Sequence, residues 1–267
     1  MKFDIIILAG KSKMDDPLLN YIYERYNKKY ESKVLIENNG VPFLRLICDV
    51  LRECPSIGDI YIAGLTENDI ELPYPVHFLD VGKETSTTDK IEYWINNYLS
   101  KKNPVPSLAL IMSGDIPTVK PEHIEDFISK IKDKECDFHY GVVEQTDMER
   151  VFPGSNRSYA KLKDGNFCGS DIFGINPQTI LKYSKTFREL TSKRKSFLKQ
   201  AFFVSPFKFI KIVLRRATLQ EVINIAEKAL KMSVDIQRLS YPELAMDIDK
   251  PFQYEIVKRY LENEEQV

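Results

Sequence analysis

A single carboxylate stands where one strand-like segment ends. The buried run Leu108–Met112 passes into Ser113 and Gly114 and then into Asp115, two residues before Pro117. An aspartate at a strand tip suits Mg²⁺, because hard divalent cations bind one or two carboxylates together with substrate phosphates. The alternative is a turn-forming aspartate before a proline.

Two further carboxylates occur near the C-terminus, Asp247 and Asp249. They alternate along an extended stretch, so their side chains point the same way, and Pro251 opens the last helix. One of them can cap that helix while the other binds metal. A second carboxylate beside Asp115 would complete a site for an ion that bridges two phosphates.

A glycine and two lysines follow the N-terminal strand. The apolar run Phe3–Ala9 breaks into Gly10, Lys11 and Lys13. Gly10 lets the backbone bend so that amide N–H groups face an anion, and the lysines add positive charge there. Ligands of an open α/β sheet bind at the carboxyl ends of its strands, so we expect this loop and Asp115 at one edge.

Lys33 is a further candidate phosphate ligand. It begins the strand-like segment Lys33–Glu37, from which its side chain can reach phosphates held by the first loop. The alternative is a solvated lysine at a strand edge.

The elements that must position these side chains alternate between strand and helix over the first two thirds of the chain. The strand-like runs are Phe3–Ala9, Lys33–Glu37, Ile60–Ala63, Val76–Leu79, Leu108–Met112 and Phe138–Val143. Helical patterns lie between them at roughly 16–29, 42–53, 88–100 and 121–132. This alternation predicts a three-layer α/β/α fold around a mainly parallel, mixed sheet.

The pattern changes in the last third. Residues 156–176 predict two short strands around a turn at Lys163–Asn166, residues 177–231 look almost wholly helical, and residues 250–263 form a final amphipathic helix. No repeat, low-complexity tract or linker interrupts the chain. We therefore expect one domain: a core in 1–176, a mostly helical elaboration in 177–245, and a metal-binding strand end with a closing helix in 246–267.

Composition indicates a folded protein with no global attraction to nucleic acid. The 267 residues carry a formal net charge of −1, so no nucleic-acid partner is expected. The four cysteines show no metal-ligand spacing and are interpreted as reduced thiols. We interpret His77, His123 and His139 as structural or surface residues. No signal peptide or membrane span is evident, which predicts a cytoplasmic location.

Four motifs, in this order, resemble those of the MobA-like NTP transferases, which are nucleotidyltransferases with a Rossmann-like GT-A fold. They are Leu8-Ala9-Gly10-Lys11, Lys33 with Gly40-Val41-Pro42, Gly114-Asp115-Ile116-Pro117 and Asp247-Ile248-Asp249-Lys250-Pro251. The segment Tyr159–Ser170 is also similar to the family's acceptor-side hairpin. The resemblance spans nearly the whole chain. It implies a Mg²⁺-dependent enzyme that transfers an NMP from an NTP to a small phosphorylated acceptor (a sugar, alditol or cofactor phosphate) and releases pyrophosphate.

The resemblance also implies a role for each matching residue. The implied nucleotide ligands are Leu8, Ala9, Gly10, Lys11, Lys33 and Gly114, and the implied metal ligands are Asp115, Asp249 and Asp247. Lys161 and Gly169 would line the acceptor pocket. Catalysis would depend on Lys33, Asp115 and Asp249, because such a reaction needs two anions held together and charge stabilised, and no protein nucleophile.

The chain departs from the family's pattern at two positions. Lys11 stands where the first loop usually has a second glycine, and Ser170 follows Gly169 where Gly-Gly-Asn would be typical. Two other functions stay open: a GT-A glycosyltransferase that uses a nucleotide-sugar, and a non-catalytic nucleotide-binding regulatory protein of the same fold. A GT-A glycosyltransferase usually carries its Asp-x-Asp motif at the end of the middle strand. In this chain Asp247 and Asp249 lie near the C-terminus instead, which favours nucleotidyl transfer.

The segment Arg188–Lys231 is basic, with 11 lysines and arginines against 3 glutamates. Aromatic residues such as Phe202 and Phe207 are interleaved with the basic ones. A solvated helical face over an apolar core is the simplest interpretation. Recruitment of an anionic acceptor, or weak contact with a membrane surface, is the alternative.

Overall fold

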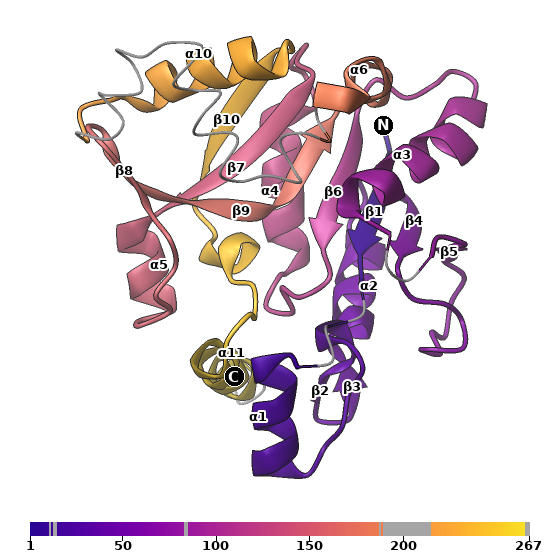
Figure 1. Ribbon diagram of the computed structural model, residues 1–267, viewed down its shortest axis with the longest axis vertical. Coiled ribbons are helices and arrows are strands. Elements are labelled where there is room, and N and C mark those ends of the chain that lie inside the picture. The colour runs from indigo at the N-terminus through magenta and orange to yellow at the C-terminus, as the bar shows by residue number, and fades with distance from the viewer. Residues whose placement is uncertain (11, 13–14, 83–84, 187, 189–214, 265–267) are drawn as a thin grey trace.

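Eight strands of the described chain form the central sheet (Figure 1). They are β1 (Phe3–Leu8), β4 (Ile57–Ala63), β5 (His77–Leu79), β6 (Ala109–Ser113), β7 (Phe138–Glu144), β8 (Ala160–Leu162), β9 (Gly165–Ile175) and β10 (Val234–Leu239). The computed structural model describes all residues except 11, 13–14, 83–84, 187, 189–214 and 265–267.

The sheet is mixed and mostly parallel. Its strands pair in the order β10-β7-β9-β6-β1-β4-β5, and β8 pairs with β9 off that path. β1 is parallel to β4 and β6, β4 to β5, and β10 to β7. Within this sheet β9 lies between β6 and β7 and is antiparallel to both, and β8 is antiparallel to β9. The predicted α/β class is therefore confirmed.

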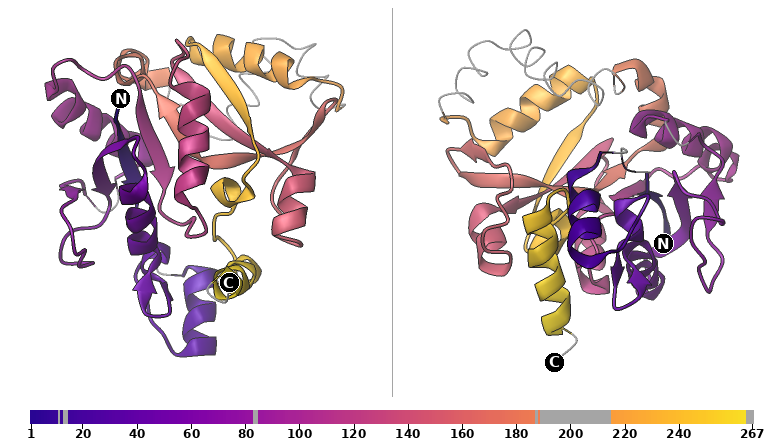
Figure 2. Two further views of the ribbon diagram at one scale, coloured as in Figure 1. Left: turned by 180° about the vertical axis from the view of Figure 1, so that it is seen from behind. Right: turned by 60° about the horizontal axis from the view of Figure 1, so that its bottom comes forward.

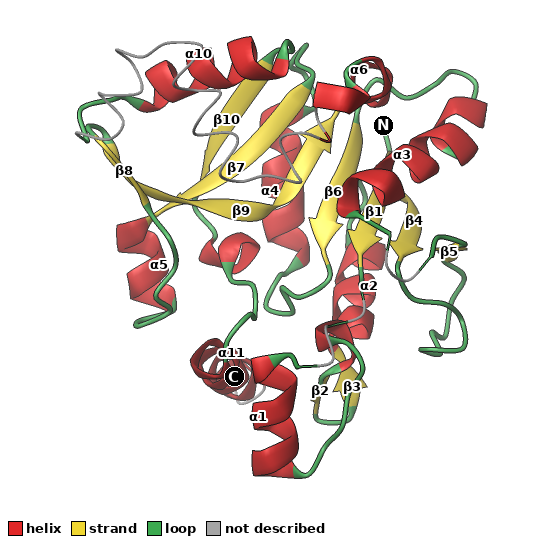
Figure 3. Ribbon diagram, viewed as in Figure 1, coloured by secondary structure: helices red, strands yellow, loops and turns green. Residues whose placement is uncertain are grey.

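Helices cover both faces of this sheet (Figure 3). The helices are α1 (Pro17–Tyr26), α2 (Phe43–Glu53), α3 (Thr87–Asn97), α4 (Pro121–Ile131), α5 (Gln145–Val151), α6 (Pro177–Lys182), α10 (Leu219–Leu230) and α11 (Pro251–Glu264). Short 3₁₀ turns are η1 (Lys33–Leu35), η2 (Leu99–Lys101) and η3 (Pro242–Ala245), and β2 (Glu37–Asn38) pairs with β3 (Val41–Pro42) as a separate hairpin.

The alternation of side chains along β1 shows why three layers form. Ile5 and Ile7 point into the core that contains α2 and α4, whereas Ile6 points into the core that contains α3 and α6. Successive residues of a strand face opposite sides of a sheet, so a strand that is apolar at every position needs helices on both sides. Figure 2 shows α2 and α4 on one face, and Figure 1 shows α3, α6 and α10 on the other.

The predicted strand Lys33–Glu37 is wrong. Lys33–Leu35 forms the 3₁₀ turn η1, and only Glu37 joins a strand, in the small hairpin apart from the main sheet. Val34 and Ile36 are both buried, so the β-branched run enters the core from a turn and not from a strand. A short apolar run in a helical turn cannot be distinguished from one in a strand by its pattern alone.

The C-terminal third also differs from expectation. Within the region predicted to be mostly helical, β10 forms a strand that pairs in parallel with β7 along its whole length. The helical prediction holds for α6 and α10, while residues 189–214 of the basic segment, with Phe202 and Phe207, lie outside the described residues. The sequence pattern does not predict the helix α5, whereas it does predict the β8–β9 hairpin. The division into core, elaboration and closing helix stays a prediction.

None of the helices in the described residues has the length and apolar character that crossing a membrane requires.

The first testable prediction concerns the core beneath α4. Phe127 is completely buried there, so replacing it with alanine leaves a cavity and removes its apolar contacts. We expect Phe127→Ala to lower the free energy of unfolding by about 3–5 kcal/mol, measured by urea denaturation. Tyr23→Ala on α1, where the tyrosine is 54% exposed, is the matched control and should change stability by less than about 0.5 kcal/mol. Equal losses in both variants would contradict this assignment of the core.

Candidate active site

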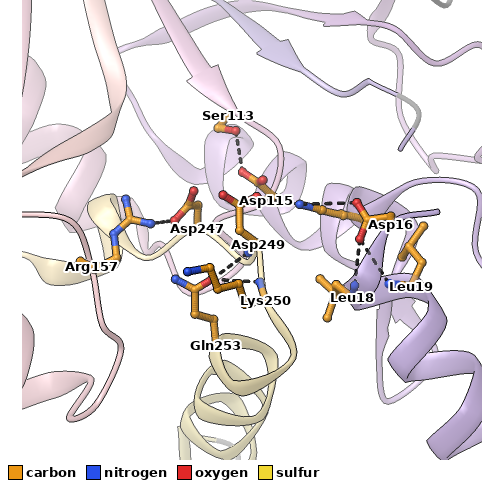
Figure 4. Close-up of polar contacts among 11 residues, drawn as sticks. Asp16, Leu18, Leu19, Ser113, Asp115, Arg157, Asp247, Asp249, Lys250 and Gln253 are labelled. Atoms are coloured by element: carbon orange, nitrogen blue, oxygen red, sulfur yellow. Dashed lines mark hydrogen bonds and ion pairs between the residues drawn. The ribbon is translucent and has the colours of Figure 1, made fainter. Parts of the chain in front are cut away.

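Three carboxylates converge at the end of β6. Asp115 follows β6 after Gly114, and the backbone N–H of Ile248 donates to the Asp115 carbonyl oxygen at 3.2 Å. This hydrogen bond holds the segment that precedes α11 against the end of the sheet. One carboxylate oxygen from each of Asp115, Asp247 and Asp249 lies within 4.8 Å of the others (Figure 4).

The surroundings of these carboxylates differ in solvation. Asp115 accepts a hydrogen bond from Ser113 Oγ at 2.5 Å. Burial raises the pKa of Asp115, and the hydrogen bond from Ser113 acts in the opposite direction. Asp249 is exposed, whereas Asp247 is half-buried. Three carboxylates so close together repel one another unless a cation lies among them.

The donor set fits a hard divalent cation. It consists of carboxylate oxygens alone, with neither cysteine nor histidine in the cluster. Oxygen ligands of this kind are those that Mg²⁺ binds, usually through one or two carboxylates with water and phosphate oxygens completing the shell.

Lys33 supplies positive charge on one side of the carboxylates. Its Nζ lies 2.6 Å from Asp249 Oδ1 and 3.7 Å from Asp16 Oδ2. Burial by itself lowers the pKa of Lys33, but the ion pairs with Asp249 and Asp16 and the charge of Asp115 raise it above its ordinary value. The lysine therefore stays protonated throughout the physiological range. Although η1 is not a strand, it brings Lys33 Nζ next to the carboxylates of Asp249 and Asp16.

Asp16 is a residue that the sequence pattern did not single out. Its side chain caps α1 by accepting hydrogen bonds from the backbone N–H groups of Leu18 and Leu19, at 3.0 and 3.4 Å. The same carboxylate pairs with Lys33. An aspartate just before Pro17 is a recognisable helix start, but nothing in the sequence indicates its second partner.

Arg157 lies on the other side of the carboxylates and was also missed. It forms an ion pair with Asp247 and a second, at 3.6 Å, with Asp171 on β9. The guanidinium side chain is 14% exposed and comes from the loop between α5 and β8. Figure 4 shows Arg157 and Asp16 on opposite sides of the carboxylates. The cluster therefore has a cationic partner at each end.

The start of α11 is held by a side-chain amide. Gln253 Oε1 accepts from the backbone N–H groups of Asp249 and Lys250, at 3.0 and 2.9 Å. Asp247 and Asp249 were expected to divide helix capping and metal binding between them. Because Gln253 satisfies these helix-terminal donors, both carboxylates are free to face Asp115.

The first loop is fixed by hydrogen bonds to its backbone. Ala9 N–H donates to Ala63 O at 3.0 Å, Gly114 N–H to Leu8 O at 3.1 Å, and Ser32 Oγ to Gly10 O at 2.6 Å. These bonds place Leu8, Ala9, Gly10 and Gly114 along the edge where the carboxylates lie. Lys11 and Lys13 lie outside the described residues.

Gly114 is required by close packing. A Cβ at this position would lie 2.9 Å from Val34 Cγ1 and 3.2 Å from Leu8 O. The absence of a side chain therefore lets η1 approach the end of β6 and bring Lys33 to the carboxylates.

The two predicted acceptor residues lie on the β8–β9 hairpin. Lys161 is exposed on β8, opposite Asn166. A Cβ at Gly169 would lie 1.6 Å from Tyr140 Oη, so this glycine makes room for the tyrosine, whose ring stacks on Phe173 with centroids 5.3 Å apart. Within the described chain, neither Lys161 nor Gly169 forms a hydrogen bond or ion pair with the carboxylates. Their role in acceptor binding stays a prediction.

The cysteines and histidines occupy structural positions. Cys48, Cys54, Cys136 and Cys168 are free thiols, and burial raises the pKa of Cys168 to about 11. Among the histidines, His139 pairs with Asp235 at 3.0 Å and His77 stacks on Tyr61. His123 Nδ1 accepts the backbone N–H of Lys120 at the start of α4.

Comparison with solved structures supports the fold. A hypothetical transferase from Thermus thermophilus superposes with a TM-score of 0.76 and 24% identity, over 95% of this chain and 99% of that one. CMP:2-keto-3-deoxy-manno-octonic acid synthetase complexed with CTP gives 0.63 and 10% identity, over 99% of this chain and 100% of that one. A 4-diphosphocytidyl-2C-methyl-D-erythritol synthase from Anaerococcus prevotii gives 0.54 and 13%, over 98% and 99%.

No family model and no curated protein sequence matches this chain. The structural likeness therefore shows a fold shared with nucleotide-using transferases, at sequence identities that carry the fold alone.

The second prediction tests the carboxylates as a metal site. Asp249 is exposed, so Asp249→Asn removes one ligand charge without disturbing the core. We expect this variant to bind Mn²⁺ at least about 10-fold more weakly than the wild type in calorimetry. Asp126→Asn, which affects an ion pair with Lys130 on α4, is the control and should leave Mn²⁺ affinity unchanged. An unchanged affinity in Asp249→Asn would remove Asp249 from the ligand set.

The third prediction concerns Arg157. Arg157→Met removes the ion pairs with Asp247 and Asp171, so we expect a loss of stability on the order of 2 kcal/mol. Added Mg²⁺ should raise the melting temperature of this variant more than that of the wild type, because a bound cation replaces the missing charge. Arg150→Met, at a more exposed ion pair with Asp147, serves as control. Equal Mg²⁺ effects in all three proteins would contradict the role of Arg157.

Proposed function

We propose that this protein is a Mg²⁺-dependent nucleotidyltransferase that transfers an NMP from an NTP to a small phosphorylated acceptor and releases pyrophosphate. The observation that carries the proposal is the convergence of Asp115, Asp247 and Asp249 with Lys33, at the carboxyl edge of a sheet built like those of nucleotide-using transferases. The resemblance of the sequence motifs to MobA-like enzymes supports the same reaction class, and membership of that family stays a prediction.

The reaction requires one bond to form at the α-phosphorus and one to break. An oxygen of the acceptor phosphate attacks the α-phosphorus of the NTP, and the bond to the bridging oxygen of the β-phosphate breaks, so that pyrophosphate leaves with that oxygen and its electron pair. Both reactants are anions, so the protein must hold them together and offset their repulsion. A nucleophilic side chain is not needed.

The proposed scheme assigns a role to each charged residue of the candidate site. Asp115 and Asp249, helped by Asp247, would hold Mg²⁺, which would neutralise charge on the α-phosphate of the nucleotidyl group being transferred. Lys33, kept protonated by its carboxylate neighbours, lies where it can contact the α-phosphate or the departing pyrophosphate. Arg157, beside Asp171, contributes positive charge on the side of the β8–β9 hairpin, where the acceptor is expected.

The names of two of the solved structures point to a first substrate to test. One is a CMP-sugar acid synthetase complexed with CTP, and another is a diphosphocytidyl synthase. We therefore place CTP first in the nucleotide series, with phosphorylated sugars and alditols as acceptors and a sugar acid as a further arm.

The fourth prediction tests this function through Lys33. Pyrophosphate release should require Mg²⁺, one NTP and an acceptor, and Lys33→Ala should lower kcat/KM by about 10²–10³ because a charge that stabilises the transition state is lost. Lys28→Ala is the control: Lys28 pairs with Glu37 at 3.0 Å, away from the carboxylates, and its loss should have no effect on the rate.

The two other functions give different results in the same assay. Turnover of a nucleotide-sugar without use of any NTP would identify a glycosyltransferase. Tight NTP binding without pyrophosphate release, across all acceptors, would identify a non-catalytic nucleotide-binding protein.

A further inference from the structure

A second lysine at the same edge of the sheet has no established role. Lys90 lies in the first turn of α3 and is only 6% exposed. A Cβ at Gly64 would lie 2.7 Å from Lys90 Nζ, and a Cβ at Gly10 would lie 3.4 Å from it. Gly10 follows β1 and Gly64 follows β4, so the ammonium group lies at the carboxyl ends of two adjacent parallel strands.

This ammonium group has no partner within the described part of the chain. No hydrogen bond or ion pair joins Lys90 Nζ to any described residue, and burial lowers its pKa. The nearest carboxylates on its own helix, Asp89 and Glu92, form ion pairs with Arg188 instead. Buried lysines without a partner are rare because desolvation of the charge is costly, so a group that arrives from outside is the natural partner.

The two glycines let the ammonium group lie close to the backbone at the ends of β1 and β4. Gly64 has a φ of 113°, which L side chains rarely adopt, and a Cβ there would also meet Ala9 O at 2.6 Å. Gly10 likewise carries no side chain. A side chain at Gly64 would displace the ammonium group, so this glycine allows Lys90 Nζ to lie at the strand ends.

The position of Lys90 relative to the carboxylates limits what that ligand group can be. The strands are ordered β4-β1-β6, and Asp115 follows β6. Lys90 is thus on the far side of β1 from the metal ligands, on the order of 10 Å away for two strand spacings. A nucleotide whose phosphates lie at Lys33 and the carboxylates has its nucleoside within reach of Lys90.

Building on the proposed function, we propose that Lys90 selects the nucleotide base, favouring bases that present a carbonyl oxygen over adenine. An ammonium group has three donors and no acceptor, so its partners must be acceptors. Cytosine, uracil and guanine each carry a ring carbonyl oxygen. Adenine carries no carbonyl oxygen: its acceptors are ring nitrogens, and it presents an amino donor at C6. With adenine the ammonium group would meet a ring nitrogen or the amino group in place of a carbonyl oxygen, and a site built for one hydrogen-bond partner discriminates against an analogue that lacks it.

The test compares nucleotide affinities in the absence of acceptor. Calorimetry with Mg²⁺ gives Kd for CTP, UTP, GTP and ATP on the wild type and on Lys90→Met, which keeps the unbranched stem and removes the donors. We expect the wild type to bind one of the carbonyl-bearing nucleotides at least about 10-fold more tightly than ATP, and the ratio to fall towards one in Lys90→Met. Lys130→Met, at an ion pair on α4, is the matched control and should keep the wild-type ratio.

A folding control accompanies the affinities. Removing an unpaired buried charge should leave the melting temperature of Lys90→Met equal to or above that of the wild type. If this variant does not fold, Lys90→Gln replaces it. Its amide offers both a donor and an acceptor, so it should bind ATP and the carbonyl-bearing nucleotides more evenly than the wild type does.

Three outcomes would overturn the inference. Equal weakening of all four nucleotides would place Lys90 on the ribose or the phosphates, and an unchanged preference would remove it from the nucleotide site. Both leave the proposed function intact. Failure of the wild type to bind any NTP would overturn the proposed function itself, and the inference with it.

Discussion

Electrostatic repulsion among three carboxylates is the constraint on which the rest of this structure depends. Asp115, Asp247 and Asp249 come from two segments more than a hundred residues apart in sequence and approach within 4.8 Å. Such an approach is stable only if positive charge surrounds it. Lys33 and Arg157 supply that charge from opposite elements, one from η1 and the other from the loop before β8. The charged side chains of the protein itself therefore offset part of the repulsion among the carboxylates.

The fold provides the close approaches that this arrangement needs. Parallel strands β1, β4 and β6 end at one edge, and each is followed by a glycine or a small residue that lets loops come near. At Gly114 the missing side chain admits Val34, and through it the whole η1 turn. Gln253 then fixes the segment that carries Asp249 by accepting two backbone N–H groups. Packing and hydrogen bonding thus position charges that would otherwise separate.

How far the sequence predicts this arrangement depends on whether a residue's partners are local. The strands around Asp115 and the helix after Asp249 follow from apolar periodicity and from Pro251, so their meeting at one edge was predictable. The turn at Lys33 was not, because Val34 and Ile36 read as a strand until the packing against Gly114 is known.

Other features depend on distant partners that leave no local signature. The strand β10 contains Asp235, whose carboxylate pairs with His139 on the neighbouring strand β7. Polar residues such as this one interrupt the apolar pattern, so the sequence does not indicate the strand that completes the sheet. Arg157 finds its two partners at positions 171 and 247, and no spacing in the sequence connects them. Gly169 fits the acceptor motif, yet the contact that demands a glycine there is with Tyr140.

The shared carboxylate of Asp16 has a consequence for how the molecule responds to its ligands. It holds the first turn of α1 through two backbone N–H groups and at the same time lies 3.7 Å from Lys33. An anion that draws Lys33 towards itself leaves Asp16 to the helix alone, so occupancy of the site and order at the start of α1 are thermodynamically linked. The linkage is reciprocal: whatever stabilises that helix turn, including α11 packed beside it (Figure 1), also changes the affinity for an anion at Lys33.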